Sequence, residues 1–215
     1  ARSRGLGDVY KRQLLLFACS GRCDLSPPVV DDVFIDGTHL VDAHGRRIFL
    51  RGVNAGGRSK IPPYAAFDFD DYDAALDDYL DATAGWGINV LRVPFSWAAM
   101  EPEEGVDDEA WLLRYDALLD GAWERGMFTI VDFHQDLYAE RYCGDGFPDW
   151  TVPDAEPAAP KTDCETWFDG YLTDDASWAA WDAFWTDSHG TQAAFYDMWS
   201  VSYTHLTLPT IREVG

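Results

Sequence analysis

Basic residues are scarce in this sequence, and their scarcity limits the partners that the protein can have. The 215 residues include 16 Lys and Arg against 38 Asp and Glu, so the formal net charge is −22 at pH 7. A negative field of this strength repels nucleic acid and anionic membrane surfaces. We therefore expect no nucleic-acid partner.

Long apolar runs are also lacking. No stretch approaches the roughly 20 apolar residues that a membrane-spanning helix needs, and the most apolar segment is the short "LLLFAC" at residues 14–19. Residues 14–18 resemble the end of a secretory signal. Cys19 is a lipidation candidate, because "LFAC" resembles a bacterial lipoprotein cleavage box, although Phe17 fits that box poorly. We expect residues 14–32 to be the remnant of an export signal and a linker.

The expected compartment follows from that segment. The protein should be exported, either secreted or held on the bacterial cell surface as a lipoprotein through Cys19. Cys143 and Cys164 flank a long polar loop, "CGDGFPDWTVPDAEPAAPKTDC". In an exported protein we expect these two residues to form a disulfide, the alternative being two free thiols.

The two ends of the chain look like translated adapter DNA. Residues 8–12 can be encoded by GAT GTG TAT AAG AGA, and with one further base the reverse complement reads Val-Ser-Tyr-Thr-His, the sequence of residues 201–205. Such an inverted repeat is typical of the transposase ends used in sequencing libraries. We expect residues 1–13 and 200–215 to be artefacts and exclude them from the fold. Residues 33–199 would then be part of a longer natural domain.

The remaining chain alternates strands and helices. Short strands punctuated by Asp-Gly and His-Gly turns predict a β-hairpin at the start. Apolar runs predict strands at 47–54, 88–95 and 127–133, whereas apolar residues spaced three and four apart predict helices at 70–84, 107–125 and 177–199, the last broken near Gly190. This alternation is typical of a parallel sheet, in a doubly wound fold or a (β/α)₈ barrel. "GVNAGG" after the first strand is not a Gly-x-Gly-x-x-Gly motif, so we expect no dinucleotide and no other cofactor.

Polar residues decide between these two architectures. "IVDFHQDLY" runs from an apolar strand directly into Asp132, His134, Gln135 and Asp136, and Arg92 lies near the end of the preceding strand. Unpaired carboxylates are costly to bury, but barrel enzymes carry their chemistry at the carboxyl ends of their strands. We therefore predict an incomplete (β/α)₈ TIM barrel of about three βα units preceded by a hairpin.

Three segments resemble a known family. "GRRIFLRGVN", "INVLRVPFSW" and "IVDFHQDLY…CGDGFPDW" are similar to the first three strands of glycoside hydrolase family 5 enzymes, and in particular to the endoglycoceramidase-like branch. In that branch a Lys-x-Pro-Pro-type segment follows the first strand, as at residues 60–63, and Asp-x-His-Gln-Asp ends the third strand. The resemblance covers about residues 33–199.

The resemblance implies a role for several residues. Arg92 matches an Arg that orients the nucleophilic carboxylate, and His134 matches a His that bonds sugar and active-site groups. Lys60 and Asp132 match positions that contact sugar hydroxyls, and Gln135 belongs to the same segment. Trp150 is a candidate sugar-stacking platform from its loop position alone, with loop packing as the other interpretation. The implied partner is a carbohydrate or glycolipid.

The sequence departs from the family in one respect. A retaining glycosidase needs two carboxyl groups, which the family places in an Asn-Glu-Pro segment after the fourth strand and in a Glu after the seventh. Neither is present, so we expect this chain itself to be inactive. One alternative is a metal-dependent hydrolase that uses Asp132, His134 and Asp136. The other is a non-catalytic carbohydrate-binding barrel.

Overall fold

The computed structural model describes residues 33–62, 64–65, 72–152, 160–205 and 211–213. The expected export signal, the Cys19 lipidation candidate and the adapter-like residues 1–13 lie outside the described residues. Two elements lie in the adapter-like segment at the other end. Helix α6 (Thr191–His205) extends six residues into it, and strand β6 (Ile211–Glu213) lies within it.

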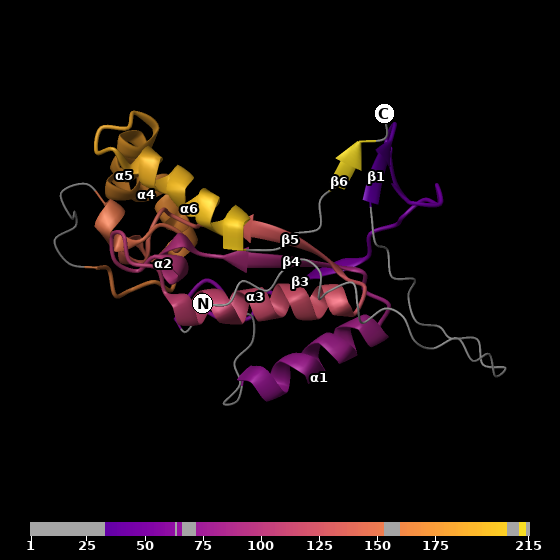
Figure 1. The fold of residues 1–215 in the computed structure, drawn as a ribbon. Helices are drawn as coiled ribbons and strands as arrows, with labels where there is room; N and C mark the ends of the chain where they lie inside the picture. The colour runs from indigo at the N-terminus through magenta and orange to yellow at the C-terminus, as the bar shows by residue number, and fades with distance from the viewer. Residues whose placement is uncertain (1–32, 63, 66–71, 153–159, 206–210, 214–215) are drawn as a thin grey trace.

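The central element is a three-stranded parallel sheet in the order β3-β4-β5. Its strands are β3 (Gly52–Asn54), β4 (Val90–Phe95) and β5 (Phe128–Phe133), and Asn54, Arg92 and Ile130 lie side by side in its register. The crossover helices α1 (Tyr72–Gly85) and α3 (Glu109–Glu124) both lie on one side of the sheet (Figure 1). A barrel places its helices on one outer face, whereas a doubly wound sheet covers both faces. This sheet is consistent with part of a barrel.

A second, smaller sheet lies apart from the first (Figure 1). β1 (Val33–Asp36) pairs antiparallel with β2 (His39–Asp42), and β6 pairs parallel with β1. The β6 pairing was not predicted, because β6 lies in the adapter-like residues 200–215, which we excluded from the fold.

The short helices gather at the end of the central sheet toward which its strand arrows point (Figure 1). They are α2 (Trp97–Met100), η2 (Glu140–Tyr142), η3 (Asp149–Thr151), η5 (Trp167–Asp169), α4 (Gly170–Thr173) and α5 (Asp175–Trp185), followed by α6. The expected break at Gly190 is present, with φ +73°. Among the described helices, none is both long and apolar enough to cross a bilayer.

Helix α3 shows how the sequence sets an element. The Asp108 carboxylate accepts a hydrogen bond of 2.9 Å from the Trp111 backbone N–H, which satisfies one free donor of the first turn. The predicted apolar stripe is buried, and the Tyr115 hydroxyl donates to the Val93 carbonyl of β4 at 2.8 Å. Gly126, at φ +73°, ends the helix as its position predicted.

The first part of the polar loop after Cys143 is buried more deeply than its composition indicates. Phe147 is 2% exposed, and its ring stacks on that of Tyr138 with centroids 4.2 Å apart. The same ring also contacts five other aromatic side chains, those of Trp97, Phe133, Trp181, Phe184 and Phe195. Burial of this irregular segment depends on partners far away in the chain, so hydropathy along the sequence does not reveal it.

Candidate active site

Two strands bring Arg92, Asp132 and His134 together. Arg92 lies in β4, Asp132 lies near the end of β5, and His134 follows β5 with its backbone N–H donating to the Phe95 carbonyl at 2.8 Å. The Arg92 guanidinium Nη2 lies 2.5 Å from Asp132 Oδ2 and 3.2 Å from His134 Nδ1. Arg92 therefore binds a carboxylate and an imidazole through one edge of its guanidinium group.

His134 Nδ1 lies 3.2 Å from the Arg92 guanidinium and 3.5 Å from Asp132 Oδ2. Because a guanidinium group only donates, Nδ1 accepts in the shorter contact, and the ring then carries a proton on Nε2. Nε2 faces Asp136 Oδ2 at 3.4 Å, and it makes no hydrogen bond within the part of the chain that the structure describes. His134 thus points a buried N–H into the second half of the site.

That second half centres on Lys60, which lies in the segment after β3. Its ammonium donates to Asp136 Oδ2 and lies 3.5 Å from Asp145 Oδ2. The Tyr171 hydroxyl donates to Asp136 Oδ1 at 2.7 Å, and the Trp167 ring lies under the ammonium with its centroid 5.7 Å from Nζ. The cation is therefore flanked by two carboxylates and an aromatic face, while part of the Lys60 side chain stays exposed.

The two carboxyl groups around Lys60 differ in acidity. Burial alone would raise the pKa of Asp136, but hydrogen bonds from Lys60 and Tyr171 outweigh it and lower that pKa. Burial raises the pKa of Asp145 to about 6, because the attraction of Lys60 offsets it only in part and the Asp136 charge adds to it. Asp145 is 7% exposed, and its Oδ1 has no hydrogen-bond partner among the described residues.

We expect Asp145→Asn to stabilise the protein at pH 7 by about 2 kcal/mol and to have little effect at pH 4. Unfolded Asp145 releases its proton near the ordinary value of 3.8, whereas the folded residue keeps it to about pH 6. The folded state holds more protons between these values, so Asp145 makes the protein less stable as pH rises through this window. Urea unfolding at several pH values measures the difference between the two proteins.

Asp163→Asn is the matched control for that series. Asp163 is an exposed carboxylate that neighbours Cys164 in the chain, so the same Asp-to-Asn change there removes a charge without touching a buried group. An equal stability difference between Asp145→Asn and the parent chain at pH 4 and pH 7 would contradict the prediction.

A metal site was the alternative interpretation of this region, and the geometry argues against it. Atoms of His134, Asp136 and Asp145 lie within 4.8 Å of one another. However, the Lys60 ammonium already lies between the two carboxylates and supplies the positive charge that a metal would bring. Asp132, which the sequence grouped with His134 and Asp136, binds Arg92 instead.

The remaining predicted residues lie at the margins of this cluster. Gln135 is half-buried, and its Oε1 has no hydrogen-bond partner within the described residues. Trp150 packs edge-on against Trp97, with centroids 5.1 Å apart, and its indole N–H donates to the Glu101 carbonyl at 3.1 Å. These contacts fit loop packing, and its role as a sugar platform stays a prediction.

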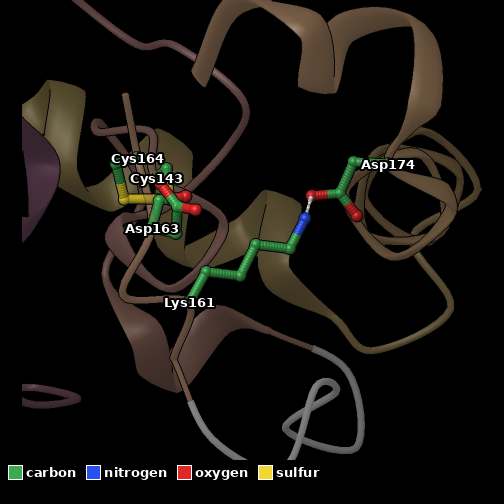
Figure 2. Close-up of a disulfide and its surroundings, with 5 residues drawn as sticks. All are labelled: Cys143, Lys161, Asp163, Cys164 and Asp174. Atoms are coloured by element: carbon green, nitrogen blue, oxygen red, sulfur yellow. Dashed lines mark hydrogen bonds and ion pairs between the residues drawn. A yellow bond between two sulfur atoms is a disulfide. The ribbon is translucent and has the colours of Figure 1, made fainter. Parts of the chain in front are cut away.

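The expected disulfide between Cys143 and Cys164 is confirmed, with Cα atoms 5.4 Å apart. Figure 2 shows Lys161 reaching from the same loop to the Asp174 carboxylate, to which it donates a hydrogen bond. Asp174 is the N-cap of α5. The disulfide and this ion pair hold the chain just before Trp167 and Tyr171, the two residues that reach the Lys60 cluster.

Sequence reasoning missed three members of the cluster, namely Asp145, Trp167 and Tyr171. Asp145 lies in Gly-Asp-Gly, which reads as a turn in which Asp would be solvated. Trp167 and Tyr171 reach the site only through the disulfide-bound loop, so no spacing in the sequence connects them with Lys60.

This chain is similar in sequence and fold to known glycoside hydrolases. The family model for cellulase (glycosyl hydrolase family 5) matches residues 41–187. Endoglycoceramidase I from Rhodococcus hoagii (strain 103S) is 33% identical over 155 residues, which cover 72% of this chain and 30% of that protein. A glucosylceramidase from Cryptococcus neoformans var. grubii is 34% identical over 142 residues, covering 60% of this chain and 19% of that protein.

Solved structures agree with the sequence matches. Endo-glycoceramidase II from Rhodococcus sp., in complex with a five-membered iminocyclitol, superposes with a TM-score of 0.55 at 29% identity. The match covers 70% of this chain and 33% of that chain. The chain thus spans about a third or less of the length of these relatives.

Proposed function

Since the chain belongs to glycosyl hydrolase family 5 and resembles its endoglycoceramidase-like members, we propose that it is the front part of a retaining glycosidase. The proposed substrates are the O-glycosidic bonds of glycolipids or of oligo- and polysaccharides. Relatives named endoglycoceramidase and glucosylceramidase support a glycolipid as the substrate, and a relative named endoglucanase A supports a polysaccharide as the substrate.

The observation that carries this proposal is that the Arg92 guanidinium, from the middle of β4, contacts both Asp132 and His134 at the carboxyl end of β5. A guanidinium group at this position can hold a neighbouring carboxylate ionised and oriented, as a nucleophile requires. In the proposed enzyme Arg92 orients the nucleophile and His134 supports it. Lys60, Asp132 and Gln135 bind sugar hydroxyls. In this proposal the nucleophile and the acid/base are glutamates outside these 215 residues, and β3, β4 and β5 would be the first three of eight barrel strands.

The proposed localisation rests on the sequence alone. Residues 14–18 would direct export, and Cys19 would tether the protein to the cell surface where lipidation occurs. A glycosidase that acts on glycolipids needs access to a membrane surface, and such a tether would supply it.

We expect this chain to bind lactose or cellobiose without hydrolysing a fluorogenic β-glucoside. Binding uses the hydroxyl contacts of Lys60 and Asp132, whereas hydrolysis needs a nucleophile and an acid/base about 5–5.5 Å apart. Asp132 and Asp136 are each already paired with a cation. Asp132→Asn should weaken sugar binding about tenfold in an NMR or calorimetric titration.

Asp163→Asn again serves as the control and should bind as the parent chain does. Turnover above a buffer blank would refute the proposed inactivity of the chain. A folded chain that binds neither sugar, or an Asp132→Asn variant with unchanged affinity, would refute the proposed sugar site.

A further inference from the structure

Asp145 has no role in the function proposed above, yet it is the most enclosed acidic group of the site. Its backbone pairs with that of Asp136 in an isolated antiparallel bridge, through hydrogen bonds of 3.1 and 2.8 Å. Residues directly opposite in such a bridge direct their side chains to the same face. Both carboxyl groups therefore approach the Lys60 ammonium from one side of the loop.

The neighbours of Asp145 prevent it from moving away. A Cβ atom on Gly144 would lie 1.8 Å from the Asp136 carbonyl oxygen, so the two backbone segments are in direct contact. The Gly146 carbonyl accepts hydrogen bonds from the Ala98 N–H at 2.9 Å and from the Ser96 hydroxyl at 3.1 Å. Asp145 is thus fixed on both sides, whereas Lys60 reaches the site through a flexible side chain.

We propose that Asp145 is a positioning residue for Lys60: when ionised it draws the ammonium into a bridge between two carboxylates, and when protonated it leaves the ammonium to Asp136 alone. The inference rests on the proposed function, because Lys60 is there a sugar contact. An ammonium has three donors. When Lys60 bridges Asp136 and Asp145, two of its N–H donors point to the carboxylates. The third N–H donor then has a defined direction and can bind a sugar hydroxyl.

The groups around Asp145 determine the pH at which Lys60 changes between the bridged arrangement and its contact with Asp136 alone. Lys60 is the only cationic side chain among the described residues that forms an ion pair with Asp145. Its other titratable neighbours come from three segments, namely Tyr64, Asp136, His134 and Tyr171. Burial raises the pKa of Asp145 to about 6, so the bridge should form as the pH rises through this value.

Lysine NMR can test the positioning directly, because the chain has three lysines, Lys11, Lys60 and Lys161. In protein labelled with ¹³C at lysine Cε, the Lys60 signal is assigned from its loss in Lys60→Arg. We expect this signal to shift in a step with a midpoint near pH 6. The step should disappear in Asp145→Asn and persist in Asp163→Asn. Lys161, bound to Asp174, serves as an internal reference.

Each outcome decides the inference. The inference is overturned if the parent chain shows no step in the Lys60 signal, or if the step persists in Asp145→Asn. It is also overturned if the step is lost in His134→Gln, where Asp145 is intact. The parent titration and the His134→Gln titration remain decisive even where Asp145→Asn does not fold.

A parallel lactose titration separates this inference from the proposed function. Affinity should fall about tenfold from pH 7 to pH 5 in the parent chain but not in Asp145→Asn. Lactose binding that is absent while the Lys60 step is present would count against the sugar site alone. A parent affinity that is independent of pH would overturn the effect of Asp145 on the sugar contact.

Discussion

Gly144→Ala is expected to lower the free energy of unfolding by about 3 kcal/mol or more, or to prevent folding. The added Cβ would lie 1.8 Å from the Asp136 carbonyl oxygen and 2.8 Å from the Leu137 Cβ. Neither neighbour can retreat easily, because Asp136 is hydrogen-bonded to Asp145 in both directions and Leu137 is 1% exposed. The backbone bridge must therefore open, and the loop must leave its place in the aromatic core.

Thermal unfolding measures this effect, and Gly56→Ala is the matched control. A Cβ on Gly56 would meet nothing within 4 Å, and that glycine has no positive φ. For a chain of this size a loss of 3 kcal/mol corresponds to roughly 6–12 °C in Tm. A Gly144→Ala protein that melts within 2 °C of the Gly56→Ala protein would show that the close approach at Gly144 is not a constraint.

Loss of the disulfide is expected to have an effect of similar size. The bond joins residues that are 21 positions apart, and opening such a loop costs about 3 kcal/mol in the chain-entropy model. It should also loosen Trp167 and Tyr171, since both follow Cys164 directly in the chain. We therefore expect Cys143→Ser with Cys164→Ser to lower Tm by roughly 6–12 °C and to release Tyr171 from Asp136.

The same melt with and without a thiol reductant provides the control. Reductant should lower the Tm of the parent chain and leave the Tm of the Cys143→Ser, Cys164→Ser variant unchanged. Cys19→Ser with Cys23→Ser should keep the full response to reductant, which shows that the effect belongs to Cys143 and Cys164. If reductant lowered the Tm of the Cys143→Ser, Cys164→Ser variant as much as that of the parent chain, the effect would not come from the Cys143–Cys164 disulfide.

Local patterns predicted the regular elements of this fold well. The apolar stripe and Asp108 cap of α3 are local features, and they set that helix within two residues of its expected start. Asp132 and His134 could also be predicted, because they end a strand in a parallel sheet. For these two residues, order along the chain carries spatial information. Arg92 was expected near the end of its strand but lies in the middle of β4, and its long side chain reaches Asp132.

The rest of the site depends on contacts that a sequence does not display. The Asp145 carboxyl group is buried because Phe147 and Tyr138, two and seven residues away, pack in the aromatic core. Phe147 contacts side chains of α5 and α6 there. For Asp145, tertiary packing outweighs local composition. The Trp150 indole N–H bonds a backbone carbonyl, which fits loop packing and leaves the sugar-platform role a prediction.

The register of the central sheet also has a consequence for the order of folding. Gly52 pairs with Val90 and Val90 pairs with Phe128, so each parallel pairing closes a loop of the same length, 38 residues. Closing such loops costs entropy before any contact compensates for it, so these pairings form more slowly than the local β1–β2 hairpin. The Arg92–Asp132 and Lys60–Asp136 ion pairs are both present only when both loops have closed and the segment after β3 has docked. The site is therefore assembled late in folding. When the chain has folded only as far as β4, Lys60 and Arg92 do not yet have their partners in place.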